Sequence, residues 1–193
     1  LNPRAAWEGM DAIEVRARAL PELNQHQRLD ALIGLEVDLA LHVDAMTRIA
    51  SALPDQEAAR ALARRLKLSN EERDRLVGAL GDDVKLTSYM SLREMRRALY
   101  LLGAEAFHGR IMLQWAAHGG NAAQWRALVA HAQMWARPKL PLGGDDVMKA
   151  GVPAGPKVGE VMREIEAWWI DADFPDDKLA IIERLKAIAQ GLK

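Results

Sequence analysis

Ser91-Leu-Arg-Glu-Met-Arg-Arg-Ala-Leu-Tyr-Leu-Leu102 shows most directly how this chain folds. Its apolar residues recur every three or four positions and therefore lie along one face of a helix. These positions are Leu92, Met95, Leu99 and Leu102. Ser91 and Glu94 have the spacing of a capping box, which predicts that the helix begins directly after Ser91. The stretch therefore predicts an amphipathic α-helix with one face in a core.

The same helical period continues through most of the chain. Alternating strand patterns are absent from the sequence, and threonine, a typical strand residue, occurs only at Thr47 and Thr87. We expect helices over 5–20, 27–53, 56–67, 70–80, 91–102, 104–118, 122–136, 156–171 and 177–190, and a short turn near 145–149. The first long pattern can also be divided into two helices. The sequence therefore predicts an all-α fold, an irregular multi-helix bundle of about eight to ten helices with short connections.

The composition is that of a chain with a buried core. Of the 193 residues, 50% are hydrophobic and 27% are charged, and none is cysteine. The lack of cysteine excludes disulfides and thiolate metal sites and is compatible with a reducing cytosol. No apolar run approaches the ~20 residues that span a bilayer, and no signal peptide is visible. We expect a cytoplasmic protein without a membrane partner. Because the chain starts at Leu1, we also expect it to be a piece of a longer protein.

Charge is distributed unevenly along the chain. The net charge is only −1, which argues against a strong nucleic-acid binder. Residues 60–110, however, carry eleven basic and seven acidic side chains, and residues 137–163 carry five basic and three acidic ones. Both ends of the chain are acidic. The middle can therefore present a positive surface, although an ordinary mixed surface explains the same numbers.

The stretch from Gly143 to Arg163 interrupts the helical pattern. It contains five glycines, two prolines and two lysines. Gly155 and Pro156 predict a bend just before a new helix, whose first N–H groups have no partner within the helix and lie at its positive end. Such an end can hold an anion, and a phosphodiester is the obvious candidate. A simple bend between two helices is the alternative.

This punctuated stretch also suggests how the chain is divided. We expect residues 1–136 to form a helical body region. Residues 137–193 then form a Gly/Pro-rich connection and a C-terminal helical tail, packed on the body as one unit. No fixed-period repeat occurs, so a solenoid is not favoured.

Two basic rows stand out on the expected helices. Arg93, Arg96 and Arg97 form one stripe with Tyr100, offset from the apolar stripe of the same helix. A second row consists of Arg60, Arg64 and Lys67. Guanidinium groups in such rows bind phosphates through charge neutralisation and paired hydrogen bonds. A solvated face, with the arginines paired to neighbouring glutamates, is the alternative.

No catalytic constellation is present in the sequence. There is no G-x-S-x-G, P-loop or H-E-x-x-H motif, and no two of the five histidines are four positions apart. Asp171-Ala-Asp173 has the spacing of a magnesium-binding carboxylate pair, but it lies at the end of a helix and is better interpreted as a solvated turn. We therefore expect no catalytic residue and no metal site in this chain.

The chain has six tryptophans, which we expect to lie mostly in the core: Trp7, Trp115, Trp125, Trp135, Trp168 and Trp169. The adjacent Trp168 and Trp169 cannot point in one direction, because successive helical residues differ by about 100°. One of the two should therefore lie near the surface, where it is available to a partner.

Leu142-Gly-Gly-Asp-Asp-Val-Met-Lys-Ala-Gly-Val-Pro-Ala-Gly-Pro-Lys-Val-Gly-Glu-Val-Met-Arg-Glu-Ile-Glu is followed by Ile170-Asp-Ala-Asp-Phe-Pro-Asp-Asp-Lys. Together they resemble the C-terminal signature of bacterial CCA-adding enzymes and their poly(A) polymerase relatives. That signature reads G-x-D-L-M, a spacer, G-x-x-G-P-x-h-G, a helix and a short acidic turn. The stretches that begin at Arg65 and Arg96 resemble the helical body of the same family, and Leu20-Pro21-Glu22 resembles the junction of neck and body.

This resemblance implies an all-helical body and tail that grip the acceptor stem and elbow of tRNA. It also implies a separate N-terminal head, in which two metal-bound aspartates carry out nucleotide addition. The parent protein would use Mg and CTP or ATP. A neck with an E-D-x-x-R motif selects the nucleotide. Neither the G-S…D-x-D of the head nor E-D-x-x-R occurs in this chain. We therefore expect the parent protein to be a tRNA nucleotidyltransferase or poly(A) polymerase, and this chain to be inactive alone and without a cofactor.

Spacing and resemblance together predict tRNA or another RNA 3′ region as a partner, beside the N-terminal catalytic head of the same polypeptide. DNA is not an expected partner. The expected RNA-binding residues are Arg93, Arg96, Arg97, Lys149, Gly155, Lys157 and Arg163. Two alternatives stay open. The chain could have activity of its own through Asp171 and Asp173, or it could be a helical protein-interaction or dimerisation module without RNA binding.

Overall fold

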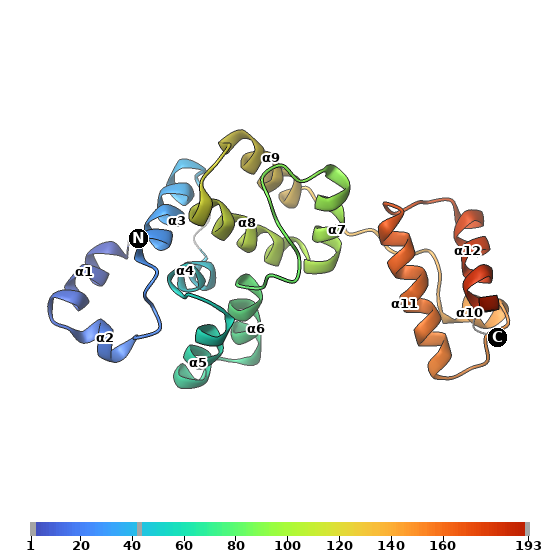
Figure 1. Cartoon of the computed structure of the whole chain (residues 1–193), viewed down its shortest axis with the longest axis horizontal. Helices are drawn as coiled ribbons and strands as arrows, with labels where there is room; N and C mark the ends of the chain where they lie inside the picture. The colour runs from blue at the N-terminus through green and yellow to red at the C-terminus, as the bar shows by residue number, and fades with distance from the viewer. Residues whose placement is uncertain (1–2, 42–43, 192–193) are drawn as a thin grey trace. The chain divides into compact units, whose positions relative to one another are not determined.

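The computed structural model describes residues 3–41 and 44–191, and the regular elements within these ranges are all helices (Figure 1). Twelve helices lie in the described ranges, ten of them with seven or more residues, which confirms the all-α prediction. In chain order they are α1 (Arg4–Ala12), α2 (Val15–Ala19), α3 (His26–Asp38), α4 (Ala45–Ala52), α5 (Gln56–Leu66), α6 (Asn70–Ala79), α7 (Leu92–Leu102), α8 (Ala104–His118), α9 (Ala122–Gln133), α10 (Gly144–Lys149), α11 (Pro156–Asp171) and α12 (Lys178–Gly191).

Both long N-terminal patterns consist of two helices each. The pattern over 5–20 breaks between α1 and α2, where Glu14 takes a left-handed conformation with φ 55°. The pattern over 27–53 breaks between α3 and α4, and residues 42–43 of this break lie outside the described residues. Asp44 caps α4 by accepting hydrogen bonds from the backbone N–H groups of Met46 and Thr47. Neither break contains glycine or proline, so the sequence has no helix-breaking residue there. The apolar periodicity alone did not show where the helices end.

The chain divides into two compact units. Unit 1 comprises the described parts of residues 1–90 and 102–135, and unit 2 comprises those of 91–101 and 136–193. Nearly all of α7 therefore belongs with α10, α11 and α12.

Unit 1 is built around α8, which packs against α3, α4, α6 and α9. Its side chains Phe107 and Ile111 are fully buried, and Met112 is almost so. Trp115 of α8 stacks on Trp125 of α9 with ring centroids 6.3 Å apart. Burying side chains of this size stabilises a fold by about 1.5–3 kcal/mol each, so α8 is a major contributor to the core of this unit.

Unit 2 is held together by α11 and α12, which lie side by side (Figure 1). Their buried apolar side chains are Val161, Ile165, Trp169, Ile170, Ile181, Leu185, Ile188 and Ala189. The Trp169 indole N–H donates to the Pro175 carbonyl at 2.8 Å. Its ring packs edge-on against Tyr100 and Phe174, with centroids 5.8 and 5.0 Å away. Tyr100 lies on α7, so this aromatic cluster joins α7 to α11.

Neither a membrane-spanning helix nor a metal-binding cluster is found in the part of the chain that the structure describes. No helix there is both long enough and apolar enough to traverse a lipid bilayer. No group of three or more His, Asp or Glu side chains in the same ranges is arranged to hold a metal ion.

Candidate nucleic-acid interface

Within unit 2, residues 143–149 contain the short helix α10, and residues 150–155 form the bend that leads into α11. The Asp146 carboxylate accepts a hydrogen bond from the Gly143 N–H at 3.0 Å and so fixes the start of α10. Val147 is buried and anchors this short helix where α10 packs on α11. Gly155 then adopts φ 136° and ψ −162°, and Pro156 is the first residue of α11. Residues 153–157 are all exposed, so the N-terminus of α11 opens to solvent.

Replacing Gly155 by alanine is expected to destabilise unit 2 without removing any contact. A Cβ at this position meets no atom within 4 Å, so the cost is conformational. The observed φ and ψ lie in a region that is essentially restricted to glycine, and forcing another residue into it costs about 1–3 kcal/mol. Urea denaturation followed by circular dichroism measures this loss. Gly159→Ala, on the exposed side of α11 and also with open space around its Cβ, is the control that should not lower stability.

Lys149 and Lys157 lie on either side of the bend. Lys149 is in the last turn of α10, and Lys157 is the second residue of α11. Both side chains are exposed, and within the described residues neither has a carboxylate in ion-pair distance. The first turn of α11 contains no acidic residue. Pro156 has no N–H, and the Val158 N–H donates to the Gly155 carbonyl at 3.1 Å, so the Lys157 N–H is the donor that this turn leaves open among the described residues. This N–H and the two ammonium groups favour an anion.

Arg163 is exposed and, among the described residues, has no ionic partner either. It lies six positions after Lys157, which places the two side chains about 120° apart around the helix, with Glu160 between them. The structure therefore brings Lys149 and Lys157 to one bend but presents Arg163 in another direction. Gly155 contributes backbone shape rather than charge.

The three predicted arginines of α7 all bind the turn at the end of α11. The Arg93 guanidinium donates to the Asp171 carbonyl, and Arg97 forms an ion pair with the Asp171 carboxylate. Nε of Arg96 is 2.8 Å from Oδ1 of Asp173, and its Nη2 contacts the other carboxylate oxygen. The arginines thus share one face of α7, as their spacing predicts. That face is engaged within unit 2, where it ties α7 to the end of α11.

The acidic turn is shaped to receive these arginines. Asp173 and Phe174 both have left-handed backbone conformations, with φ 64° and 60°. The Phe174 ring packs on Tyr100 and Trp169 and so holds the turn in place. The hydrogen bond from Arg96 holds the pKa of the Asp173 carboxyl below its ordinary value, so this carboxylate is ionised at neutral pH. A phosphate would have to displace it to reach Arg96.

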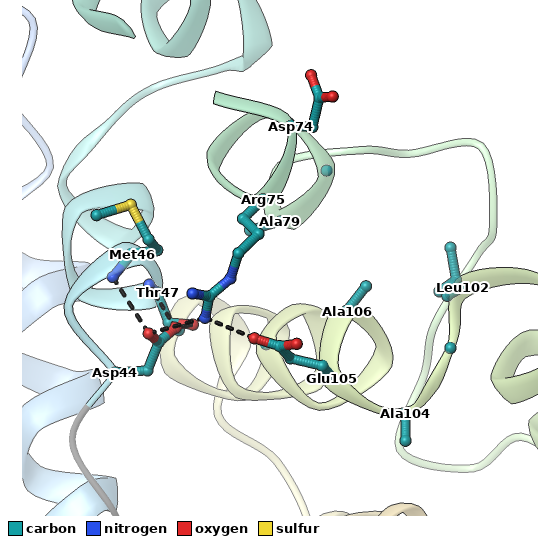
Figure 2. A pocket seen from close by; sticks show the side chains of 13 residues that line it. Asp44, Met46, Thr47, Asp74, Arg75, Ala79, Leu102, Ala104, Glu105 and Ala106 are labelled. Carbon is teal, nitrogen blue, oxygen red and sulfur yellow. Dashed lines mark hydrogen bonds and ion pairs between the residues drawn. The ribbon is translucent and has the colours of Figure 1, made fainter. Parts of the chain in front are cut away.

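Unit 1 has a charged groove of about 320 Å³ between α4, α6 and α8 (Figure 2). Nη2 of Arg75 lies 3.1 Å from Oδ1 of Asp44 and 2.6 Å from Oε1 of Glu105. Figure 2 shows Arg75 pointing toward both carboxylates, while Asp74 points away from them. Three carboxylates and one guanidinium line the groove, so it repels a phosphate. Sequence reasoning missed this cluster, because no local pattern pairs charges that are about thirty residues apart.

His108 of α8 lines the adjoining hollow and makes stability depend on pH. Burial lowers its pKa, against the opposing attraction of Asp44. The unfolded chain, with a histidine pKa of about 6.5, therefore binds the proton at a higher pH than the folded chain. Stability should be greatest above about pH 6.5 and should fall, by at most about 1.4 kcal/mol per pH unit, as the pH drops toward the folded pKa.

Comparing wild type with His108→Gln isolates this effect. Denaturant unfolding at about pH 7 and at about pH 5 should show a larger acid-induced loss for wild type than for His108→Gln. An equal loss in both proteins would mean that His108 is protonated equally easily in the folded and the unfolded chain.

The comparisons with known proteins give little further guidance. No protein-family model matches the chain. Over 77 residues the chain is 39% identical to a protein of Rhodospirillum rubrum described as an uncharacterized 28 kDa protein in the petA 5′ region. The matched part covers 36% of this chain and 30% of that protein. The chain thus spans less than a third of the length of this relative, whose description assigns it no activity.

Proposed function

We propose that this chain is an RNA-binding helical region of a protein that adds nucleotides to RNA 3′ ends, and that unit 2 holds the sugar–phosphate backbone at the bend before α11. The observation that carries the proposal is the pair Lys149 and Lys157. These two exposed ammonium groups, without carboxylate partners in the described chain, lie just before the bend and in the first turn of the 16-residue helix that follows it. Charge and unpaired N–H groups are what a phosphodiester requires.

The proposal assigns the other predicted residues supporting roles. Arg163 contacts a neighbouring phosphate on a different side of α11, and Gly155 shapes the bend. Arg93, Arg96 and Arg97 hold the tail through the acidic turn. They leave at most one positive charge uncompensated there, because the turn carries two carboxylates. RNA affinity then depends mainly on the bend.

The proposed roles of an N-terminal head and of this chain follow from the resemblance of residues 142–178 to CCA-adding enzymes. Under this proposal an N-terminal head of the same polypeptide forms the new phosphodiester bond with Mg and CTP or ATP. This chain positions tRNA or another RNA 3′ region and makes no bond itself. The absence of cysteine supports a place in the cytoplasm.

Fluorescence anisotropy with labelled tRNA at increasing salt tests this function. We expect saturable binding that weakens steeply with salt, because phosphate contacts release counterions. A DNA duplex of equal length should bind more weakly. Incubation with tRNA, CTP, ATP and magnesium should give no label incorporation. No tRNA binding even at low salt would refute the proposal.

A protein-interaction or dimerisation module is the second candidate. It is favoured by large apolar side chains that lie open to solvent, such as Met134 at 85% and Leu179 at 74% exposure. Light scattering with and without tRNA separates the two. A dimer that forms independently of RNA, without tRNA binding, would support this candidate instead.

A further inference from the structure

Unit 1 contains a second kind of cavity, beside the irregular segment between α6 and α7. It has a volume of about 530 Å³, within the range of roughly 300–1,000 Å³ that small-molecule sites occupy. Residues 81–89 form one wall, and α8 and the start of α9 form the other. Every lining residue belongs to unit 1.

The wall of this cavity is fixed by a buried arginine. Arg110 is 7% exposed, and its Nε donates to the Gly78 carbonyl at 2.6 Å. Its Nη1 pairs with Oδ1 of Asp83 at 2.7 Å. Gly81 lies so close to this guanidinium that a Cβ there would be 2.2 Å from Nη2. The segment is therefore tied to α8 by side chains that are already satisfied, and the cavity is preformed.

Two aromatic side chains line the cavity, the buried Trp125 and the exposed Tyr89. Trp125 is 4% exposed, stacks on Trp115, and donates its indole N–H to the Gly119 carbonyl at 2.8 Å. These two contacts hold the Trp125 ring in place. Tyr89 is the opposite case, with 74% of its surface exposed and, among the described residues, no ring or hydrogen-bond partner. An aromatic ring left this open beside a cavity is suited to stack on a planar ligand.

Polar side chains complete the lining. Gln114 is half-buried and has no hydrogen-bond partner within the described residues, so its amide can both donate to and accept from a ligand. Lys85 and His118 are exposed basic groups without ionic partners there. Asp82 also lines the cavity, and its carboxylate is exposed. Ser88 is already bonded to Gln124.

We propose that this cavity binds one nucleotide, with its base stacked on Tyr89, a base edge on the Gln114 amide and its phosphate on Lys85. A lone inorganic anion would use Lys85 but leave the aromatic and amide groups without a role. The nucleotide is either a free nucleoside monophosphate or an unpaired residue of an RNA strand, because both have the same base and phosphate. The site lies in unit 1 and does not depend on the bend of unit 2.

Quenching of tryptophan fluorescence in the full chain, with Trp125 as reporter, tests this site. The probes are AMP, CMP and ribose 5-phosphate, followed by a short single-stranded RNA and a blunt RNA duplex. AMP or CMP should bind saturably, and ribose 5-phosphate at least tenfold more weakly. If only the single strand binds, the nucleotide is an unpaired residue of RNA. In the Lys149→Ala, Lys157→Ala and Arg163→Ala triple variant, which lacks the proposed phosphate contacts of unit 2, the duplex should not bind.

Variants give the decisive comparison. Tyr89→Ala should weaken binding about 5- to 100-fold, the range that loss of one base–aromatic stack gives, while Tyr89→Phe keeps the affinity. Lys85→Ala should weaken it about tenfold. Lys67→Ala, at the C-cap of α5, is the charge control and should have no effect. The triple variant Lys149→Ala, Lys157→Ala and Arg163→Ala should bind AMP normally, which separates this site from unit 2.

Two results would overturn the proposal. One is the absence of saturable binding of every nucleotide probe. The other is equal affinity for AMP and ribose 5-phosphate with no change in Tyr89→Ala, which would reveal a simple anion site. Circular dichroism of each variant verifies that it is folded.

Discussion

Simultaneous replacement of Lys149, Lys157 and Arg163 by alanine is expected to lower tRNA affinity about 100-fold or more at about 0.1 M salt. Each lost phosphate contact removes about 0.7–0.9 from the slope of log affinity against log salt, so the slope should become shallower by about two to three. All three side chains are exposed, so their removal should not disturb the core. Salt-titrated fluorescence anisotropy measures both quantities.

The control has the same charge change in the same unit. Lys178, Arg184 and Lys186 are exposed cations of α12, and their triple alanine variant should keep the wild-type slope to within about one unit. If both triple variants lost affinity equally, RNA binding would depend on the overall charge of the chain and not on the bend before α11.

Trp169→Ala is expected to cost about 3–5 kcal/mol of unfolding free energy, the largest loss that we expect from one substitution in unit 2. The side chain is 2% exposed and is surrounded by the Tyr100 and Phe174 rings. Its removal leaves a cavity and deprives the Pro175 carbonyl of its donor. It should also loosen the turn that Arg96 binds. Chemical denaturation gives the magnitude.

Trp168→Ala is the matched control for this prediction. Trp168 is the same residue type at the adjacent position, but it is only half-buried. It should cost about 1 kcal/mol. Equal losses for the two variants would mean that the Trp169 cluster does not hold α7 and α11 together.

Local features of the fold could be predicted from the sequence. Ser69 with Glu72 has the same capping-box spacing as Ser91 with Glu94, and the structure forms both boxes. Asn121 caps α9 as its position suggests. Asp176 follows Pro175 and so suits the entry of a helix by sequence, but Asp177 is the residue whose carboxylate accepts from the backbone N–H groups of that turn. Such features depend on neighbours within about four positions, which a sequence displays directly.

Long-range features could not be predicted in the same way. The spacing of Arg93, Arg96 and Arg97 shows that they share a face, but not that Asp171 and Asp173 meet them there. These partners are more than seventy residues away, and a basic stripe has the same pattern whether it faces solvent, phosphate or carboxylate. The expected packing of the tail on the body as one unit stays a prediction, as does the RNA-binding function.

The adjacent tryptophans illustrate where a local rule suffices. Their positions, about 100° apart on a helix, required them to point in different directions. Trp169 is buried and Trp168 is half-buried, in agreement with that expectation. The rule did not say which of the two enters the core, because the burial of Trp169 depends on Tyr100 and on the turn at Phe174.

Lysine acetylation with and without bound tRNA, read by mass spectrometry, tests the central claim most directly. It compares individual lysines of the unmodified sequence, so no variant has to fold. We expect bound tRNA to protect Lys149 and Lys157 strongly and to leave Lys67 and Lys178 as reactive as in the free chain. Equal reactivity of Lys149 and Lys157 in free and tRNA-bound protein would contradict the account.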